Sequence, residues 1–321
     1  MPFVRDMKSV DALGCVCSAV ILLLASVRIP VIGSFLSLLT PLPFLYYATK
    51  MGLQEGLKVV AFAGVVVGVL TYLLGYPQIL LGYVEFSVVG MILAKAYQRG
   101  FSFGYTVFWG TILMLFVGLI MVTLLGLTKG GGPQAIIQEV LQNDLKGSLL
   151  QIYPEMASDP EQSQKAETFV NAVIAFIARI YPAVVIVYAG FTVWLNIVIS
   201  RPLFRIANLR YPGFGRADRW SSPEGMVWGL IAAGFSLFLP VHGIKFLAIN
   251  TVIVLSVIYV FHGLSVLLFF FNKYRVPSWL RVVGYFLIFF QFLFFGIGLA
   301  MAGLFDQWID FRKIHYRKAT E

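Results

Sequence analysis

The sequence predicts an all-α protein, a bundle of about nine transmembrane helices with one amphipathic helix outside the membrane. Two observations predict this class. First, 59% of the 321 residues are hydrophobic and only 12% are charged, about half the usual charged share of a soluble domain. Second, the apolar residues form long runs without alternation, and a bilayer core requires helices of about 20 such residues. This composition excludes disorder, a secreted disulfide scaffold and an ordinary soluble enzyme.

Nine apolar runs justify the helices in chain order. They cover residues 10–27, 30–49, 57–75, 77–95, 103–127, 169–200, 223–240, 244–271 and 282–305. The second run contains Pro41 and Pro43, so we expect a kinked or partly re-entrant helix there. Eight spans are the alternative count, with this second run as the one to leave out.

The basic residues indicate orientation rather than nucleic-acid binding. With a cytoplasmic N-terminus, the cytoplasmic loops hold fourteen Lys and Arg residues before the tail and the opposite loops hold five, as the positive-inside rule requires. The net charge of +9 does not indicate nucleic-acid binding, because no soluble segment is long enough for a basic face. An odd number of spans places the C-terminus outside, although the tail is itself basic.

Two segments lie outside the membrane. One of them, a basic cytoplasmic loop over 201–222, separates residues 1–200 from residues 223–321. The outer loop 128–168 contains apolar residues at helical spacing over 136–152, which predicts a helix that is either a lid or a surface anchor. In the basic loop, Ser221, Ser222, Pro223 and Glu224 have the spacing of a capping box. We therefore expect these residues to begin the seventh helix.

Ionisable residues inside the membrane are the candidates for substrate contact. Glu85 on the fourth helix and Arg179 on the sixth have opposite charges, so they either pair with each other or hold a charged ligand. His262 stands alone in its sequence neighbourhood and predicts no metal site. The candidate substrate-binding set adds polar neighbours and one loop residue: Tyr76, Gln78, Tyr83, Asn171, Tyr181 and Arg28.

Other patterns concern partners and chemistry. Gly64 and Gly68, and likewise Gly225 and Gly229, have the small-x-x-x-small spacing that lets helices pack closely, either within the chain or against a partner. The chain lacks a G-x-x-x-x-G-K-[ST] loop, an H-E-x-x-H pair and a G-x-S-x-G elbow. We therefore expect no enzyme, no cofactor and no ATP hydrolysis by this chain.

The C-terminal string of residues 303–313 (GLFDQWIDFRK) combines aromatic and charged residues. Asp306 and Asp310 are four residues apart, so they share a helix face. The string is either an interfacial anchor or a contact for the arginines of residues 201–219. The second alternative needs both segments on one side of the membrane, whereas nine spans place them on opposite sides.

The first six predicted helices resemble the substrate-binding S component of energy-coupling factor transporters. The resemblance lies in the small residues of the first helix, in residues 39–43 (LTPLP) and in residues 50–56 (KMGLQEG) before a Gly-rich third helix. It implies a small solute bound from outside. It also implies two partners, a coupling-type membrane subunit that packs on the first helix and a cytosolic ATPase.

Most of the chain resembles the YybS-like family of bacterial membrane proteins. The matching elements are residues 41–43 (PLP), the loop beginning with 211–214 (YPGF), residues 261–265 (FHGLS) and the C-terminal string. This resemblance implies a bacterial cytoplasmic membrane but no mechanism. Two hypotheses follow: a substrate-binding or transport subunit without its own ATPase, or a non-transporting scaffold that organises other membrane proteins or lipids.

Overall fold

The computed structural model describes residues 2–29, 32–76, 79–128 and 160–313, which are mostly helical and contain no strand. Within these ranges, five helices are long and apolar enough to cross a membrane, and a sixth crossing results if one bent pair counts as a span. The predicted all-α membrane bundle is therefore confirmed. The predicted helix over 136–152 and Gln78 lie outside the described residues.

The chain divides into two compact units, which are described separately. One comprises Met1–Gly147 with Tyr188–Gly213, and the other comprises Ser148–Val187 with Phe214–Glu321. The long helix α9 (Pro160–Ile206) contributes residues to both units. It begins nine residues before the predicted sixth helix, so the end of the predicted outer loop is helical.

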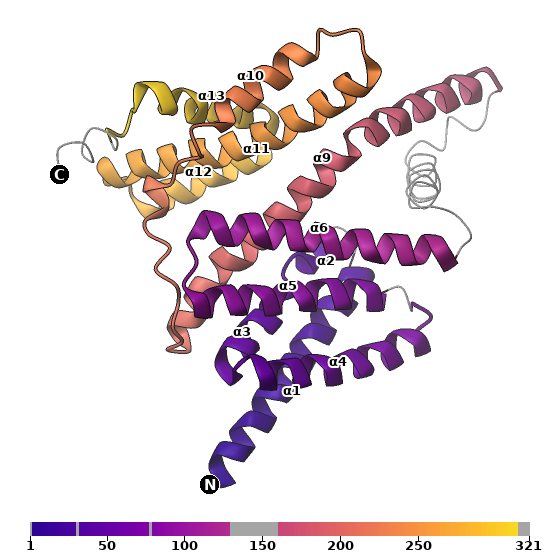
Figure 1. Ribbon diagram of the computed structural model, residues 1–321, viewed down its shortest axis with the longest axis vertical. Helices are drawn as coiled ribbons and strands as arrows, with labels where there is room; N and C mark the ends of the chain where they lie inside the picture. Colours follow the sequence, from indigo (N-terminus) through magenta and orange to yellow (C-terminus); the bar gives the residue numbers. More distant parts are fainter. Residues whose placement is uncertain (1, 30–31, 77–78, 129–159, 314–321) are drawn as a thin grey trace. The chain divides into compact units, whose positions relative to one another are not determined.

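The first unit is a bundle of short and long helices (Figure 1). Its elements are α1 (Pro2–Arg28), α2 (Ile32–Ser37), α3 (Pro41–Met51), α4 (Leu53–Leu73), α5 (Ile79–Arg99), α6 (Phe103–Thr128) and the end of α9. Its core includes Ala19, Phe44, Val67 and Tyr83, and the rings of Phe44 and Tyr83 meet edge to face at 5.4 Å. Burial of such apolar side chains stabilises the packing of α1, α3, α4 and α5.

The predicted interruption of the second helix is confirmed. Helix α2 ends at Ser37 and α3 begins at Pro41, because proline cannot donate the backbone hydrogen bond that a continuous helix needs. The Nδ2 of Asn196 on α9 donates to the carbonyl of Leu38, which is buried, at 2.7 Å. The broken backbone is thus satisfied by a buried amide inside the unit.

The second unit contains a 3₁₀ turn, η3 (Ala217–Arg219), and four helices: α10 (Met226–Ser236), α11 (His242–Lys273), α12 (Ser278–Phe290) and α13 (Phe292–Ile309). Helix α11 packs against α10, α13 and η3. Helices α12 and α13 are bent by 108°. The predicted seventh span over 223–240 is wrong, because the eleven residues of α10 extend only about 16 Å, about half the bilayer core.

Two glycines allow α11 and α13 to approach closely. A Cβ atom on Gly263 of α11 would meet the carbonyl oxygen of Leu299, and one on Gly303 of α13 would meet that of Tyr259. Small residues at a helix contact permit this backbone approach. The approach brings polar side chains on both helices within hydrogen-bond distance of each other.

Asn250 connects α11 to the part of α9 in the same unit. Its Oδ1 accepts from the N–H of Ala183, and its Nδ2 donates to the carbonyl of Arg179, each at 2.8 Å. These backbone groups are four residues apart and flank Pro182, which has no N–H of its own. The buried amide therefore supplies hydrogen bonds at the point where α9 contains a proline.

Candidate functional site

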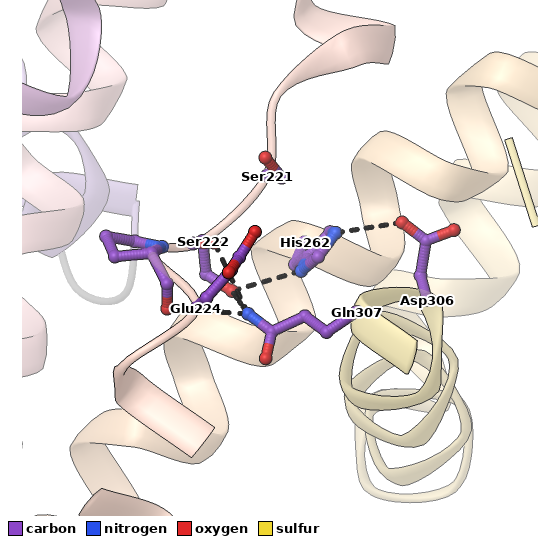
Figure 2. A pocket seen from close by; sticks show the side chains of 7 residues that line it. Ser221, Ser222, Glu224, His262, Asp306 and Gln307 are labelled. Atoms are coloured by element: carbon purple, nitrogen blue, oxygen red, sulfur yellow. Dashed lines mark hydrogen bonds and ion pairs between the residues drawn. The ribbon is translucent and has the colours of Figure 1, made fainter. Parts of the chain in front are cut away.

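A buried polar network in the second unit joins three segments that lie far apart in the sequence. Ser222 precedes α10, His262 lies on α11, and Asp306 and Gln307 lie near the end of α13. Figure 2 shows Ser222 and His262 pointing toward each other, with Asp306 on the opposite side of the imidazole ring and the Gln307 amide beside Ser222.

The chain beyond α13 turns back so that Arg312 completes this network. Helix α13 ends at Ile309, and Asp310 adopts a left-handed conformation with φ of 46°, a common way to terminate a helix. The guanidinium of Arg312 then bonds the Oδ2 of Asp306 from Nη2 at 2.7 Å and from Nε at 3.0 Å. Both side chains are at most 3% exposed, so each charge depends on the other for compensation.

Arg312 also satisfies the irregular backbone before α10. Its Nη1 donates to the carbonyls of Asp218 and Trp220 at 3.1 and 2.9 Å, and to the Oγ of Ser265 at 2.9 Å. Irregular backbone among apolar helices needs such partners. Residues in direct contact lie on one side of a membrane, so the predicted placement of the C-terminal string opposite the basic loop is wrong.

For Asp306, the expected contact between the string and the arginines of the basic loop takes a different form. Asp306 pairs with Arg312 of its own string, and it is Arg312 that reaches residues 218 and 220. The local turn at Asp310 explains the difference, because it folds the arginine back onto the carboxylate.

The contacts of His262 place opposite requirements on its Nε2 atom. Nη2 of Arg312 lies 2.9 Å from Nε2 of His262, which itself lies 3.1 Å from the Oδ2 of Asp306. A guanidinium only donates and a carboxylate only accepts, so the first contact needs a lone pair on Nε2 and the second needs a proton. Nδ1 lies 3.1 Å from the Oγ of Ser222, as donor or acceptor according to the tautomer.

Ser222 and Gln307 complete the network toward its open side. The Nε2 of Gln307 donates to the Oγ of Ser222 at 2.8 Å, and its Oε1 accepts from the hydroxyl of Tyr259 at 3.2 Å. The Ser222 oxygen thus accepts from Gln307 and lies within hydrogen-bond distance of Nδ1 of His262.

The order Ser222, His262, Asp306 resembles a nucleophile, a base and an orienting carboxylate. Nucleophilic catalysis requires a histidine lone pair that accepts the hydroxyl proton. Nδ1 of His262 lies 3.1 Å from Ser222 and its Nε2 lies 3.1 Å from Asp306, with Arg312 also in contact with Nε2. The three side chains are thus in the order of such a group, and a guanidinium contacts the ring nitrogen that faces the carboxylate.

A cavity of about 280 Å³ borders the network. Residues 221–224 line one part of it, and His262, Asp306 and Gln307 line the other. Glu224 is exposed, and its carboxylate makes no hydrogen bond or ion pair with any residue that the structure describes. The cavity therefore combines a hydrogen-bonded inner wall with one uncompensated carboxylate.

The predicted capping box is wrong, and the error leads to this cavity. Helix α10 begins at Met226 with Gly225 as its N-cap and without a side-chain cap. The hydroxyl of Ser222 bonds the network instead, and Glu224 lines the cavity. A local sequence pattern that the fold does not use is typical of functional positions.

A second polar cluster lies beside the network, around Asp218 of η3. Its carboxylate accepts from Nε and Nη2 of Arg216 at 3.1 and 2.7 Å, and from Nδ2 of Asn272 at 3.0 Å. These donors, Arg216 first, lower the pKa of the Asp218 carboxyl below its usual value. The cluster fixes η3 against the end of α11.

The residues predicted for substrate contact do not line this cavity. Glu85 lies on α5 in the first unit, half-buried, with its carboxylate beside Gly118 of α6. Arg179 is exposed on the part of α9 that belongs to the second unit. Their mutual contact stays a prediction.

The other predicted contact residues have varied surroundings. Tyr83 is buried in the core of the first unit and donates to the carbonyl of Val60. Tyr76 and Tyr181 are half-buried, and Asn171 is exposed. The backbone of Arg28 ends α1, but its side chain lies outside the described residues.

The glycines predicted for partner packing have neighbours within the chain. A Cβ atom on Gly64 would lie 3.1 Å from Tyr83, one on Gly68 3.6 Å from Leu80, and one on Gly229 3.5 Å from Leu255. Gly64 and Gly68 also line an open apolar groove of about 630 Å³ between α4 and α5. A Cβ atom on Gly225 would meet no atom within 4 Å. A partner subunit at these positions stays a prediction.

Comparison with known proteins identifies the family. The family model described as predicted membrane protein (DUF2232) matches residues 17–307. The chain belongs to the DUF2232 family. The DUF2232 match covers the network from Ser222 to Gln307, and the predicted membrane location is confirmed at the level of a membrane protein.

One curated relative extends this result. The DUF2232 chain is 21% identical over 300 residues to YybS of Bacillus subtilis (strain 168), which covers 91% of this chain and 93% of the relative. The predicted YybS-like resemblance is thus confirmed. No solved structure matches the chain significantly, and the resemblance to an S component stays a prediction.

Proposed function

We propose that this DUF2232 protein is a non-enzymatic solute-binding protein, the substrate-binding or transport subunit for a small polar solute. The observation that carries the proposal is the 280 Å³ cavity beside a buried network of Ser222, His262, Asp306 and Arg312. Buried ionisable groups of membrane proteins commonly mark solute or proton pathways.

The cavity size favours a small solute. Pockets for drug-sized ligands begin at roughly 300 Å³, and this cavity is slightly smaller.

Energy for transport would come from partners. The sequence has no P-loop, so a coupling-type membrane subunit and a cytosolic ATPase would drive the solute cycle, as in the transporters that the first six predicted helices resemble. We place the protein in a bacterial cytoplasmic membrane with its N-terminus in the cytoplasm, on the charge distribution of its loops.

Native mass spectrometry of the protein extracted in mild detergent tests solute binding. We expect a bound small molecule in the wild type and its loss in Gln307→Ala, because this change removes hydrogen bonds that form the cavity wall. Gln98→Ala, at an exposed position of α5, is the matched control and keeps the molecule.

Copurification distinguishes the proposal from a scaffold function. Recovery of an ATPase and a membrane subunit in fixed stoichiometry supports a transport subunit. An empty cavity in the wild type, together with recovery of unrelated membrane proteins, would overturn the proposal in favour of a non-transporting scaffold.

A further inference from the structure

One carboxylate at the cavity has no partner. Asp306 is paired with Arg312, and both side chains are buried. Among the described lining residues, Glu224 alone is a carboxylate without an ion pair or hydrogen bond. The uncompensated charge at the cavity is therefore that of a single carboxylate.

The hydrogen-bonding groups of the inner wall are already used. The Ser222 oxygen accepts from Gln307 and contacts Nδ1 of His262, and the Gln307 oxygen accepts from Tyr259. Such groups lose existing bonds if a ligand recruits them. The polar interaction that a ligand gains most readily is therefore with Glu224.

We infer that the cavity selects a small organic cation, an ammonium or amidinium group on a short apolar remainder, with the carboxylate of Glu224 as its counter-ion. This inference deepens the proposed function and depends on it. Filling the cavity removes water from part of the exposed Glu224 carboxylate, a loss that a cation compensates and a neutral solute does not. An anion would meet like charge, with the hydroxyl of Ser221 as its donor.

Three probes of nearly equal size and different charge test the inference: propylammonium, propan-1-ol and propionate. Isothermal titration calorimetry on the full chain in detergent at pH 7 gives the affinity of each. We expect propylammonium to bind at least about tenfold more tightly than the other two, as a close charge pair at partly buried sites allows.

Variants connect the preference to one carboxylate. Glu224→Gln should reduce propylammonium binding about tenfold, and Glu224→Lys should shift the preference to propionate. Glu55→Gln is the control, because Glu55 is paired with Lys58 on the surface of the first unit and its loss leaves the preference intact. A change of net charge or detergent interaction would affect both glutamine variants equally.

The outcomes separate the two claims. Equal binding of propanol, or preferred binding of propionate, overturns the cation inference and leaves solute binding in place. Absence of propylammonium binding at 100-fold excess over protein also overturns it, while native mass spectrometry decides solute binding independently. Equal loss in Glu224→Gln and Glu55→Gln would show that Glu224 is not the counter-ion.

Discussion

Glu85 in the first unit and Asp306 in the second are both carboxylates on apolar helices, yet their surroundings differ. Asp306 is 3% exposed and is bonded by two nitrogen atoms of Arg312. Glu85 is half-buried and makes no hydrogen bond or ion pair with the described residues. One is therefore a structural element of a compensated network, and the other is an isolated charge.

The difference between these two carboxylates shows that a charge on an apolar helix does not by itself indicate a role. The rule that a carboxylate inside a membrane helix is a functional candidate selects Glu85 but not Asp306, which follows the last predicted apolar run. Asp306, the compensated carboxylate, shapes the cavity indirectly because it fixes Arg312 and His262. Its removal would cost a large part of the stability of the fold. Compensation, rather than membrane depth, decides which charge stabilises the fold.

The largest expected effect comes from breaking this compensation. Asp306→Ala leaves the buried guanidinium of Arg312 unpaired and should lower the free energy of unfolding by about 3–5 kcal/mol. Glu85→Ala removes a charge without a partner and should cost about 1 kcal/mol or less. Denaturant unfolding in detergent micelles, followed by helical circular dichroism, measures both.

A double variant sharpens the comparison. Asp306→Leu with Arg312→Met replaces the pair by apolar side chains of similar size and should recover part of the stability lost in Asp306→Ala, because the carbonyls of Asp218 and Trp220 still lose their donor. Equal destabilisation by Asp306→Ala and Glu85→Ala would contradict the distinction between the two carboxylates.

Much of the fold follows from the sequence because apolar runs reflect a local physical requirement. A run such as 244–271 needs only its own hydrophobicity to predict α11, and Pro41 alone explains the break before α3. The prediction of a seventh span over 223–240 was wrong because the apolar residues continue past Ser236, where α10 ends. Hydropathy does not distinguish a helix from the irregular apolar segment that follows it.

The network could not be predicted, because its members meet only through the tertiary fold. His262 is 40 residues from Ser222 and 44 from Asp306, and the sequence gives no local sign that they meet. His262 and Asp306 both belong to segments that carry the family resemblance, but as separate strings. Arg312 was seen only as a basic residue of the tail, since the turn at Asp310 depends on the packed helix end.

An intermediate effect is expected at the helix contact that holds the network together. A methyl group on Gly263 would collide with the backbone of Leu299, so Gly263→Ala should cost about 1–3 kcal/mol or more by forcing α11 and α13 apart. Gly298→Ala on α13 is the matched control, because a Cβ atom there meets no atom within 4 Å. The same unfolding assay compares them.

Ligand binding by the Gly263→Ala variant shows whether the substitution separates the two helices or only strains the backbone locally. If Gly263→Ala separates the helices, propylammonium binding should weaken together with stability, since His262 and Gln307 lie on the two helices concerned. Unchanged stability in Gly263→Ala, or equal losses in Gly263→Ala and Gly298→Ala, would show that the close approach is not required.

The smallest effect concerns the exposed partner of Asp218 and depends on pH. The pKa of Asp218 is lowered in the folded protein, first by Arg216 and also by Asn272. A depressed carboxyl pKa stabilises the fold above the ordinary value near 3.9, and this contribution is lost as pH falls through the folded pKa. Asp218→Asn should therefore destabilise the protein at pH 6 by no more than about 1 kcal/mol, because solvent screens the largely exposed Arg216.

The difference between wild type and Asp218→Asn should shrink as the pH is lowered from about 4 toward 2, because the wild-type carboxyl then becomes protonated. Arg216→Gln should move this loss to higher pH, whereas Arg219→Gln, on the same 3₁₀ turn but without a hydrogen bond to Asp218 among the described contacts, should leave it unchanged. Thermal unfolding midpoints across this pH range test both variants. A difference that persists at low pH would mean that Asp218 stabilises the fold through hydrogen bonds that form whether or not its carboxyl is protonated. Asp218 would then differ even more from Asp306, whose pairing with Arg312 depends on charge.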